Sequence, residues 1–172
     1  PMESPELRER ALYLLGWSYS RTNKADESAR AFEEMAKAKG AAGGVMTASA
    51  AFQAGEARMQ TKEYAAALEH FTKAVEAAKP GTEDHASALI RKAECEALTD
   101  HWNQSQATYT AFIQQYGPAK HKLLPQAQFG QGWAMENQKD YARAIATYRQ
   151  VTARKEKDAL SARCQFQIGE CL

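Results

Sequence analysis

The chain has 172 residues, of which 44% are hydrophobic and 25% charged, and these values suit either one folded domain or a short array of repeats. With 22 basic and 21 acidic side chains, its formal net charge is +1, so no bulk charge attracts nucleic acid or an anionic membrane. No stretch approaches the roughly 20 apolar residues that a membrane span needs. We therefore expect no nucleic-acid partner and no direct membrane insertion.

The start of the chain leaves the compartment open. Residues 1–5 lack the basic and then apolar layout of a signal peptide. Because Pro1 precedes Met2, the start resembles a cut end, so the missing signal is uninformative. A soluble protein of the periplasm and cell envelope, or of the cytoplasm, fits this start.

Helical patterning and the breaks between segments predict nine helices. Breaks rich in glycine or proline lie at 40–44, 79–81 and 117–118, and short polar turns, several with Asp or Asn as helix caps, divide the remaining segments. In chain order, the predicted helices cover residues 5–21, 25–38, 45–60, 64–78, 85–99, 102–115, 124–138, 141–154 and, without a following partner, 158–171.

One residue pattern recurs along these helices: a small residue, a second small residue twelve positions later, and an aromatic residue four positions after that. Successive copies begin 39, 38, 39 and 37 residues apart. The copies are Gly16, Ser28 and Phe32; Gly55, Ala67 and Phe71; Ala93, Ser105 and Tyr109; Gly132, Ala144 and Tyr148; and Gly169, which opens a fifth.

This spacing predicts antiparallel helical hairpins, because two helices approach closely only where side chains are minimal. The aromatic residue, one turn further along the same face, is expected to fill the space beside that contact. We expect a single array over 1–172, with repeats at about 5–40, 45–80, 85–117 and 124–156, and the first helix of a fifth at 158–172.

The sequence resembles the tetratricopeptide repeat (TPR) family over essentially its whole length. The fourth copy carries the resemblance best, in residues 127–134, 139–145 and 148–151. It departs from the family pattern in a period longer than the usual 34 residues, in Ala25 where an aromatic is usual, and in Ala93 in place of glycine. The resemblance implies an all-α fold, a right-handed α-solenoid whose concave wall is lined by the first helix of each pair.

An aromatic residue three positions before the glycine, as in Tyr13 and Phe166, is similar to bacterial cell-envelope TPR proteins. Those proteins include the periplasmic protein that binds TolA and the lipoprotein of the outer-membrane assembly machine. This sub-group resemblance implies a bacterial protein of the cell envelope.

The resemblance also implies that partners bind on the concave face. The first-helix positions there form an aromatic stripe interrupted by acidic residues and one arginine, which suits an apolar partner segment with basic side chains. We predict partner contacts from Tyr13, Trp17, Phe52, Glu56, Arg91, Glu94, Phe129 and Trp133. The competing interpretation is that Tyr13, Phe52 and Phe129 only pack in the core, whereas a large indole pointing away from the hairpin, as expected for Trp17 and Trp133, favours a contact role.

No catalytic motif, phosphate loop or metal-ligand spacing is present, and Cys95, Cys164 and Cys171 read as packing residues. We therefore predict no enzyme, no cofactor and no metal. The function predicted is a non-catalytic scaffold that binds a protein, as a peptide or helix, on its concave face. The alternative is a structural or oligomerising segment of a longer TPR solenoid in a bacterial envelope assembly. The uncapped final helix implies either further repeats or self-association. A regulatory module whose curvature changes on binding a signalling peptide is a third class, and no residue selects it.

Overall fold

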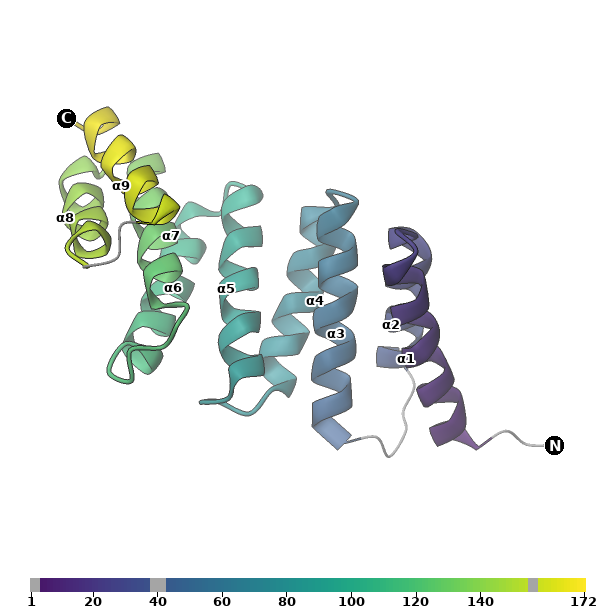
Figure 1. Cartoon of the computed structure of the whole chain (residues 1–172). Coiled ribbons are helices and arrows are strands. Elements are labelled where there is room, and N and C mark those ends of the chain that lie inside the picture. Colours follow the sequence, from purple (N-terminus) through teal and green to yellow (C-terminus); the bar gives the residue numbers. More distant parts are fainter. Residues whose placement is uncertain (1–3, 38–42, 155–157) are drawn as a thin grey trace. The chain divides into compact units, whose positions relative to one another are not determined.

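The computed structural model describes residues 4–37, 43–154 and 158–172, and over these ranges the chain forms nine helices and no strand (Figure 1). No predicted helix end within the described ranges is more than two residues from the observed one, and the predicted end at residue 38 lies outside them. The helices are α1 Pro5–Arg21, α2 Ala25–Lys37, α3 Gly43–Gln60, α4 Tyr64–Ala77, α5 Glu83–Leu98, α6 Trp102–Tyr116, α7 Leu124–Asn137, α8 Tyr141–Thr152 and α9 Ala159–Glu170.

Local sequence explains several of the helix starts. Pro5 occupies the first turn of α1, where its missing N–H costs nothing, and the Ser4 side chain accepts a hydrogen bond from the Leu7 backbone N–H. Asp140 and Asp158 cap α8 and α9 in the same way. One boundary prediction was wrong: Gly43 and Gly44 belong to α3 and not to the preceding break. Glycine is tolerated there because the first turn of a helix makes few of its hydrogen bonds.

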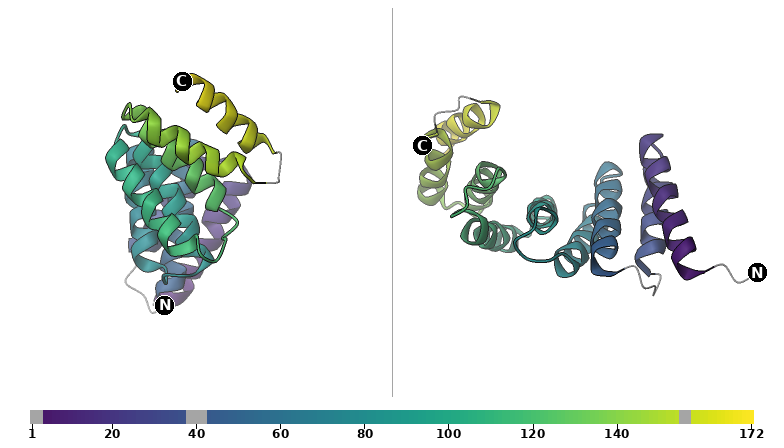
Figure 2. Two further views of the ribbon diagram at one scale, coloured as in Figure 1. Left: turned by 90° about the vertical axis from the view of Figure 1, so that its left-hand side faces the viewer. Right: turned by 60° about the horizontal axis from the view of Figure 1, so that its bottom comes forward.

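The chain divides into two compact units, Pro1–Ala88 and Leu89–Leu172. Within the first unit, α1 packs on α2, α2 on α3 and α3 on α4, and within the second, α6 packs on α7, α7 on α8 and α8 on α9 (Figure 2). In these pairs, helices that follow each other in sequence are neighbours in space within their unit, as expected of repeated hairpins. The single array over 1–172 stays a prediction.

The small residues of the repeat let paired helices touch. The Ser28 hydroxyl donates a 2.9 Å hydrogen bond to the Gly16 carbonyl oxygen, and Ser105 makes the same 2.9 Å bond to Ala93. A Cβ added to Gly16, Gly55 or Gly132 would lie 2.7 Å from the aromatic ring of its own repeat. Those rings belong to Phe32, Phe71 and Tyr148, all with no exposed surface. The predicted role of both small and aromatic positions is confirmed.

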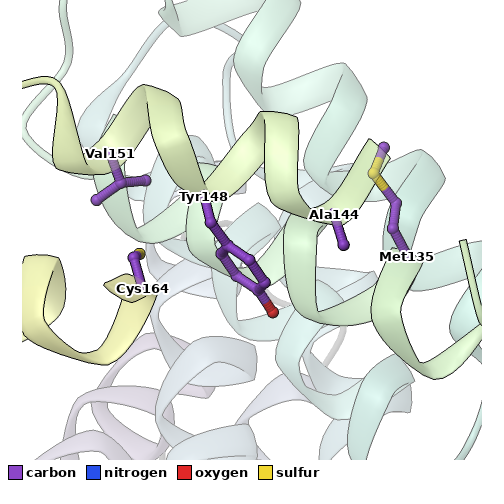
Figure 3. Close-up of a cluster of buried hydrophobic side chains, with 5 residues drawn as sticks. All are labelled: Met135, Ala144, Tyr148, Val151 and Cys164. Carbon is purple, nitrogen blue, oxygen red and sulfur yellow. The ribbon is translucent and has the colours of Figure 1, made fainter. Parts of the chain in front are cut away.

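The aromatic position belongs to the local core in the first and fourth repeats, through Phe32 and Tyr148. Figure 3 shows this for the last hairpin, where the Tyr148 ring lies among side chains of α7, α8 and α9. The Tyr148 hydroxyl donates a 2.7 Å hydrogen bond to the Glu136 carboxylate, so its polar end is satisfied. The cluster consists of Met135, Ala144, Tyr148, Val151 and Cys164.

Every hairpin turn has one residue with left-handed backbone geometry, two positions after its first helix ends. These residues have φ between 57° and 64°. Asn and Asp tolerate this conformation, whereas lysine adopts it at a cost. The four residues are Asn23, Lys62, Asp100 and Lys139.

Candidate protein-interaction surfaces

In the first unit, Tyr13 and Trp17 lie one turn apart on α1 and both contact Phe32. The Tyr13 and Trp17 rings meet Phe32 edge to face, at centroid distances of 5.9 and 6.1 Å. The Tyr13 hydroxyl lies 3.3 Å from the Ser49 hydroxyl of α3. Trp17 keeps 37% of its surface exposed. Trp17 therefore does not point wholly away from the hairpin: one side packs on it and the other faces solvent.

On α3, Phe52 and Glu56 lie one turn apart and both are half-buried. The Phe52 ring contacts Phe71 edge to face at 5.4 Å and packs against a small alanine cluster. Phe52 also borders a small pocket of about 160 Å³ with polar and acidic sides. Its lining is Ala48, Ser49, Phe52, Gln53, Ala74, Ala78, Asp84 and Ser87.

In the second unit, the predicted charged residues of α5 pair with each other. An Arg91 nitrogen donates to the Glu94 carboxylate at 2.8 Å. The other Glu94 oxygen accepts a 2.7 Å hydrogen bond from the Gln126 side chain of α7. Both oxygens of Glu94 are thus satisfied within the chain, which weakens the expectation that Glu94 recognises a basic partner residue.

Phe129 and Trp133 of α7 are half-buried. The Phe129 ring lies 5.7 Å from Tyr148 and packs against the cluster of Figure 3. The Trp133 indole meets Trp102 edge to face at 5.1 Å. These contacts hold both rings in place, and each ring keeps part of its surface exposed.

A groove that the repeat pattern did not predict lies between α7 and α9 beside these two rings. Its volume is about 530 Å³. The Arg163 guanidinium lies over the Phe129 ring at 4.6 Å, and Phe166 is 67% exposed. Phe166 sits at the same repeat position as Phe129, but Arg163 is three residues further back, where no candidate was sought. The lining is Phe129, Trp133, Ala162, Arg163, Phe166 and Gln167.

The packing of α2, α3 and α4 includes a half-buried charge cluster around Glu33. Arg58 donates a 2.8 Å hydrogen bond to Glu33, and the His70 Nε2 lies 3.1 Å from the same carboxylate oxygen. Burial alone would raise the pKa of Glu33, but the hydrogen bonds and charges of Arg58 and His70 together lower it. Burial lowers the pKa of His70 and outweighs the attraction of Glu33. The cluster joins three helices and has the character of a structural network.

Cys164 and the possible metal ligands are the remaining side chains with the potential for chemistry in the described part of the chain. Burial raises the pKa of Cys164 to about 11, which disfavours its thiolate, the reactive form of cysteine. Within residues 4–37, 43–154 and 158–172, no group of His, Cys, Asp and Glu side chains is arranged to hold a metal ion. No helix in those ranges has both the length and the apolar character of a membrane span.

Consecutive hairpins with this repeated contact define an α-helical repeat protein. Two tetratricopeptide-repeat family descriptions match the sequence, at residues 13–83 and 126–154. The chain belongs to the TPR family, and the predicted class, an all-α solenoid of TPR hairpins, is confirmed.

Solved structures with the same fold share little sequence with this chain. The apo form of RapI matches with a TM-score of 0.82 at 18% identity, over 98% of this chain and 49% of RapI, so the chain spans about half of that protein. MamA matches with a TM-score of 0.75 at 15% sequence identity, over 95% of this chain and 80% of MamA. The TPR-like repeats of a Podosopora anserina protein named as a putative kinesin light chain match with a TM-score of 0.77 at 13% sequence identity. The match covers 99% of this chain and 87% of that protein chain. No curated protein matches the sequence.

Proposed function

We propose that this chain is a non-catalytic interaction module that binds a peptide or helix of a protein partner on the first helices of its hairpins. TPR proteins are generally non-catalytic interaction scaffolds, and repeat arrays bind on the surface that their repeats share. In the first unit the proposed contact residues are Tyr13, Trp17, Phe52 and Glu56. In the second unit they are Arg91, Glu94, Phe129 and Trp133.

The observation that carries this proposal is a difference between the aromatic residues of the two helix types. Phe32, Phe71 and Tyr148, on second helices, have no exposed surface. The first-helix aromatics Trp17, Phe52 and Phe129 pack on those rings without being fully buried, and Trp17 and Phe166 remain 37% and 67% exposed. Rigid, partly exposed aromatic side chains are the type that dominates binding energy at protein interfaces.

Partner charge differs between the two units in this proposal. In the first unit, the Asp84 carboxylate on α5, which lines the pocket beside Phe52, supports a partner segment with basic side chains. In the second unit, Glu94 is already paired with Arg91 and Gln126, so apolar contact with Phe129 and Trp133 supplies most of the proposed recognition.

Peptide selection from a random display library, with the whole chain as bait, tests the proposal. Selected peptides should bind Trp17→Ala or Trp133→Ala at least tenfold more weakly, since a buried aromatic anchor commonly contributes more than about 1.4 kcal/mol. The matched control is Tyr141→Ala, because Tyr141 is a large aromatic residue, 45% exposed, on the second helix α8. Unchanged binding to both tryptophan variants would overturn the proposal.

The alternative, a structural segment of a longer TPR array in a bacterial envelope assembly, has one observation in its favour. Leu7 and Leu14 lie two turns apart on α1 and are 62% and 68% exposed. An apolar strip of this kind suits the packing of a further helix. If it mediates self-association, light scattering should show a mass that rises with concentration, and the change Leu7→Ser with Leu14→Ser should abolish that rise. A constant monomer mass for the wild type would argue against it. Self-association through the final helix, α9, stays a prediction that the same measurement tests.

A further inference from the structure

The α7–α9 groove has an apolar body and one charged end. Phe129 and Trp133 come from α7, and Ala162 and Phe166 from α9. These side chains surround an open space of about 530 Å³, within the usual size range of ligand pockets. A large apolar side chain of a partner would remove surface of Trp133 and of the 67% exposed Phe166 from water.

Among the residues that the structure describes, Arg163 is the one charged side chain that lines this groove. Its guanidinium stacks on Phe129 at 4.6 Å, and a stacked guanidinium keeps the N–H groups at its edge available for hydrogen bonds. Among the described residues, Arg163 makes no ion pair. Its charge therefore faces the groove without a carboxylate from the described part of the chain.

Within the described ranges, the acidic residues of α7 and α9 and of the α9 N-cap are engaged or distant. Glu136 accepts hydrogen bonds from the Tyr148 hydroxyl at 2.7 Å and from the Gln167 amide at 3.2 Å. Asp158 accepts one from the Ser161 backbone N–H at 2.8 Å and pairs with Arg154 at 3.2 Å. Glu170 lies seven residues after Arg163 on α9, which is about 10 Å along the helix axis.

We infer that this groove binds a segment of a partner polypeptide in which an acidic side chain stands next to a large apolar one. The carboxylate pairs with the Arg163 guanidinium through two parallel hydrogen bonds, and the apolar side chain lies between Trp133 and Phe166. This inference rests on the proposed function and names the partner chemistry of its second unit. For the second unit, the sequence suggested a partner with basic side chains, whereas this inference specifies an acidic one. The reason is that Glu94 is paired within the chain and Arg163 is not.

The same peptide selection tests the inference when it is repeated with variants of the groove as bait. The peptides that the wild type selects should be enriched in Asp or Glu beside Phe, Leu, Ile or Trp. Their affinity should fall roughly 10- to 100-fold for Arg163→Gln, as expected when a charged hydrogen-bonded pair is removed. Arg163→Lys should recover part of the loss, because lysine keeps the charge but not the planar fork. Phe166→Ala should also weaken binding. Because Phe166 is 67% exposed, this change should leave the fold intact.

Arg149→Gln is the matched control, because Arg149 is exposed on α8 and does not line the groove. Acidic peptides that lose affinity for Arg163→Gln but not for Arg149→Gln support the inference. Basic peptides, or acidic ones equally affected by both changes, overturn it while the proposed function stands, provided the tryptophan variants still lose binding. The inference is wrong if no peptide is enriched. It is also wrong if light scattering shows that the chain self-associates and Phe166→Ala abolishes this self-association, because the groove then binds a second copy of the chain.

Discussion

The Gly16 backbone and the Phe32 ring are in such close contact that no side chain fits between them: a Cβ on Gly16 would lie 2.7 Å from the ring. The same relationship recurs between Gly132 and Tyr148. Because Phe32 and Tyr148 are fully buried, neither ring can move aside without disturbing its core.

Gly16→Ala should therefore destabilise the chain, although alanine is the better helix former. Overpacking costs about 1–3 kcal/mol, more than the roughly 1 kcal/mol that helix propensity returns. Gly169→Ala is the matched control, since nothing lies within 4 Å of a Cβ at Gly169, and it should stabilise α9 slightly. Chemical denaturation of both variants measures the difference, and an equal effect of the two would refute the packing argument.

Truncation of a central aromatic should have a larger effect. Phe71→Ala or Tyr148→Ala removes a fully buried ring and leaves a cavity, at a cost of about 3–5 kcal/mol. Tyr141→Ala, at a 45% exposed ring, should cost much less. Thermal and urea melts test this, and a Tyr148→Ala melt that coincides with wild type would show that the repeat phase is misassigned.

The left-handed turns predict two stabilising substitutions. Lys62 and Lys139 have φ of 62° and 64°, a conformation that asparagine adopts more readily than lysine. Lys62→Asn and Lys139→Asn should each stabilise the chain by about 0.5 kcal/mol, because asparagine tolerates the left-handed conformation that Asn23 adopts at the equivalent turn. Lys73→Asn, on the exposed face of α4, should instead destabilise by a similar amount. If all three changes have the same sign, the turn geometry is not the cause.

His70 should make stability depend on mildly acidic pH. Its Nε2 contacts Glu33, its Nδ1 is buried without a hydrogen-bond partner in the described part of the chain, and its pKa is lowered by burial. The unfolded chain therefore takes up the proton first, and the free energy of unfolding falls as pH drops below about 6.5. His85, whose pKa burial also lowers, contributes in the same direction.

A second loss is expected at lower pH, because the folded state lowers the pKa of Glu33. That stabilisation is present above the ordinary glutamate pKa of about 4.3 and is lost as pH falls through the lower folded value. Urea unfolding of the wild type and of His70→Gln between pH 7 and 5 tests the histidine part. The free energy of unfolding should fall less steeply with pH in His70→Gln than in the wild type, although the nearby charges of Arg58 and Lys73 remain. Equal slopes in the two proteins would show that His70 is not the cause.

Much of the fold was predictable because its determinants recur in sequence at a fixed spacing. The pattern of Gly16, Ser28 and Phe32 fixes helix pairing, and the structure confirms it through the Ser28 hydrogen bond and the buried ring. The left-handed turns were missed because lysine at positions 62 and 139 carries no compositional signal for that conformation.

The candidate site was less predictable, because long-range pairing decides which side chains remain available. The sequence predicts that Glu94 is available to a partner, but in the structure Gln126, 32 residues away, donates a hydrogen bond to it. Trp133 packs on Trp102, and Arg163 gains its position over Phe129 only when α7 and α9 come together. None of these partners follows from the repeat spacing alone.

The most direct test of the central claim is an NMR titration of the isotopically labelled chain with one selected peptide. Perturbed backbone amides should concentrate on the first helices, α1, α3, α5, α7 and α9, together with the indole signals of Trp17 or Trp133. Perturbations confined to the second helices, α2, α4, α6 and α8, would contradict the account.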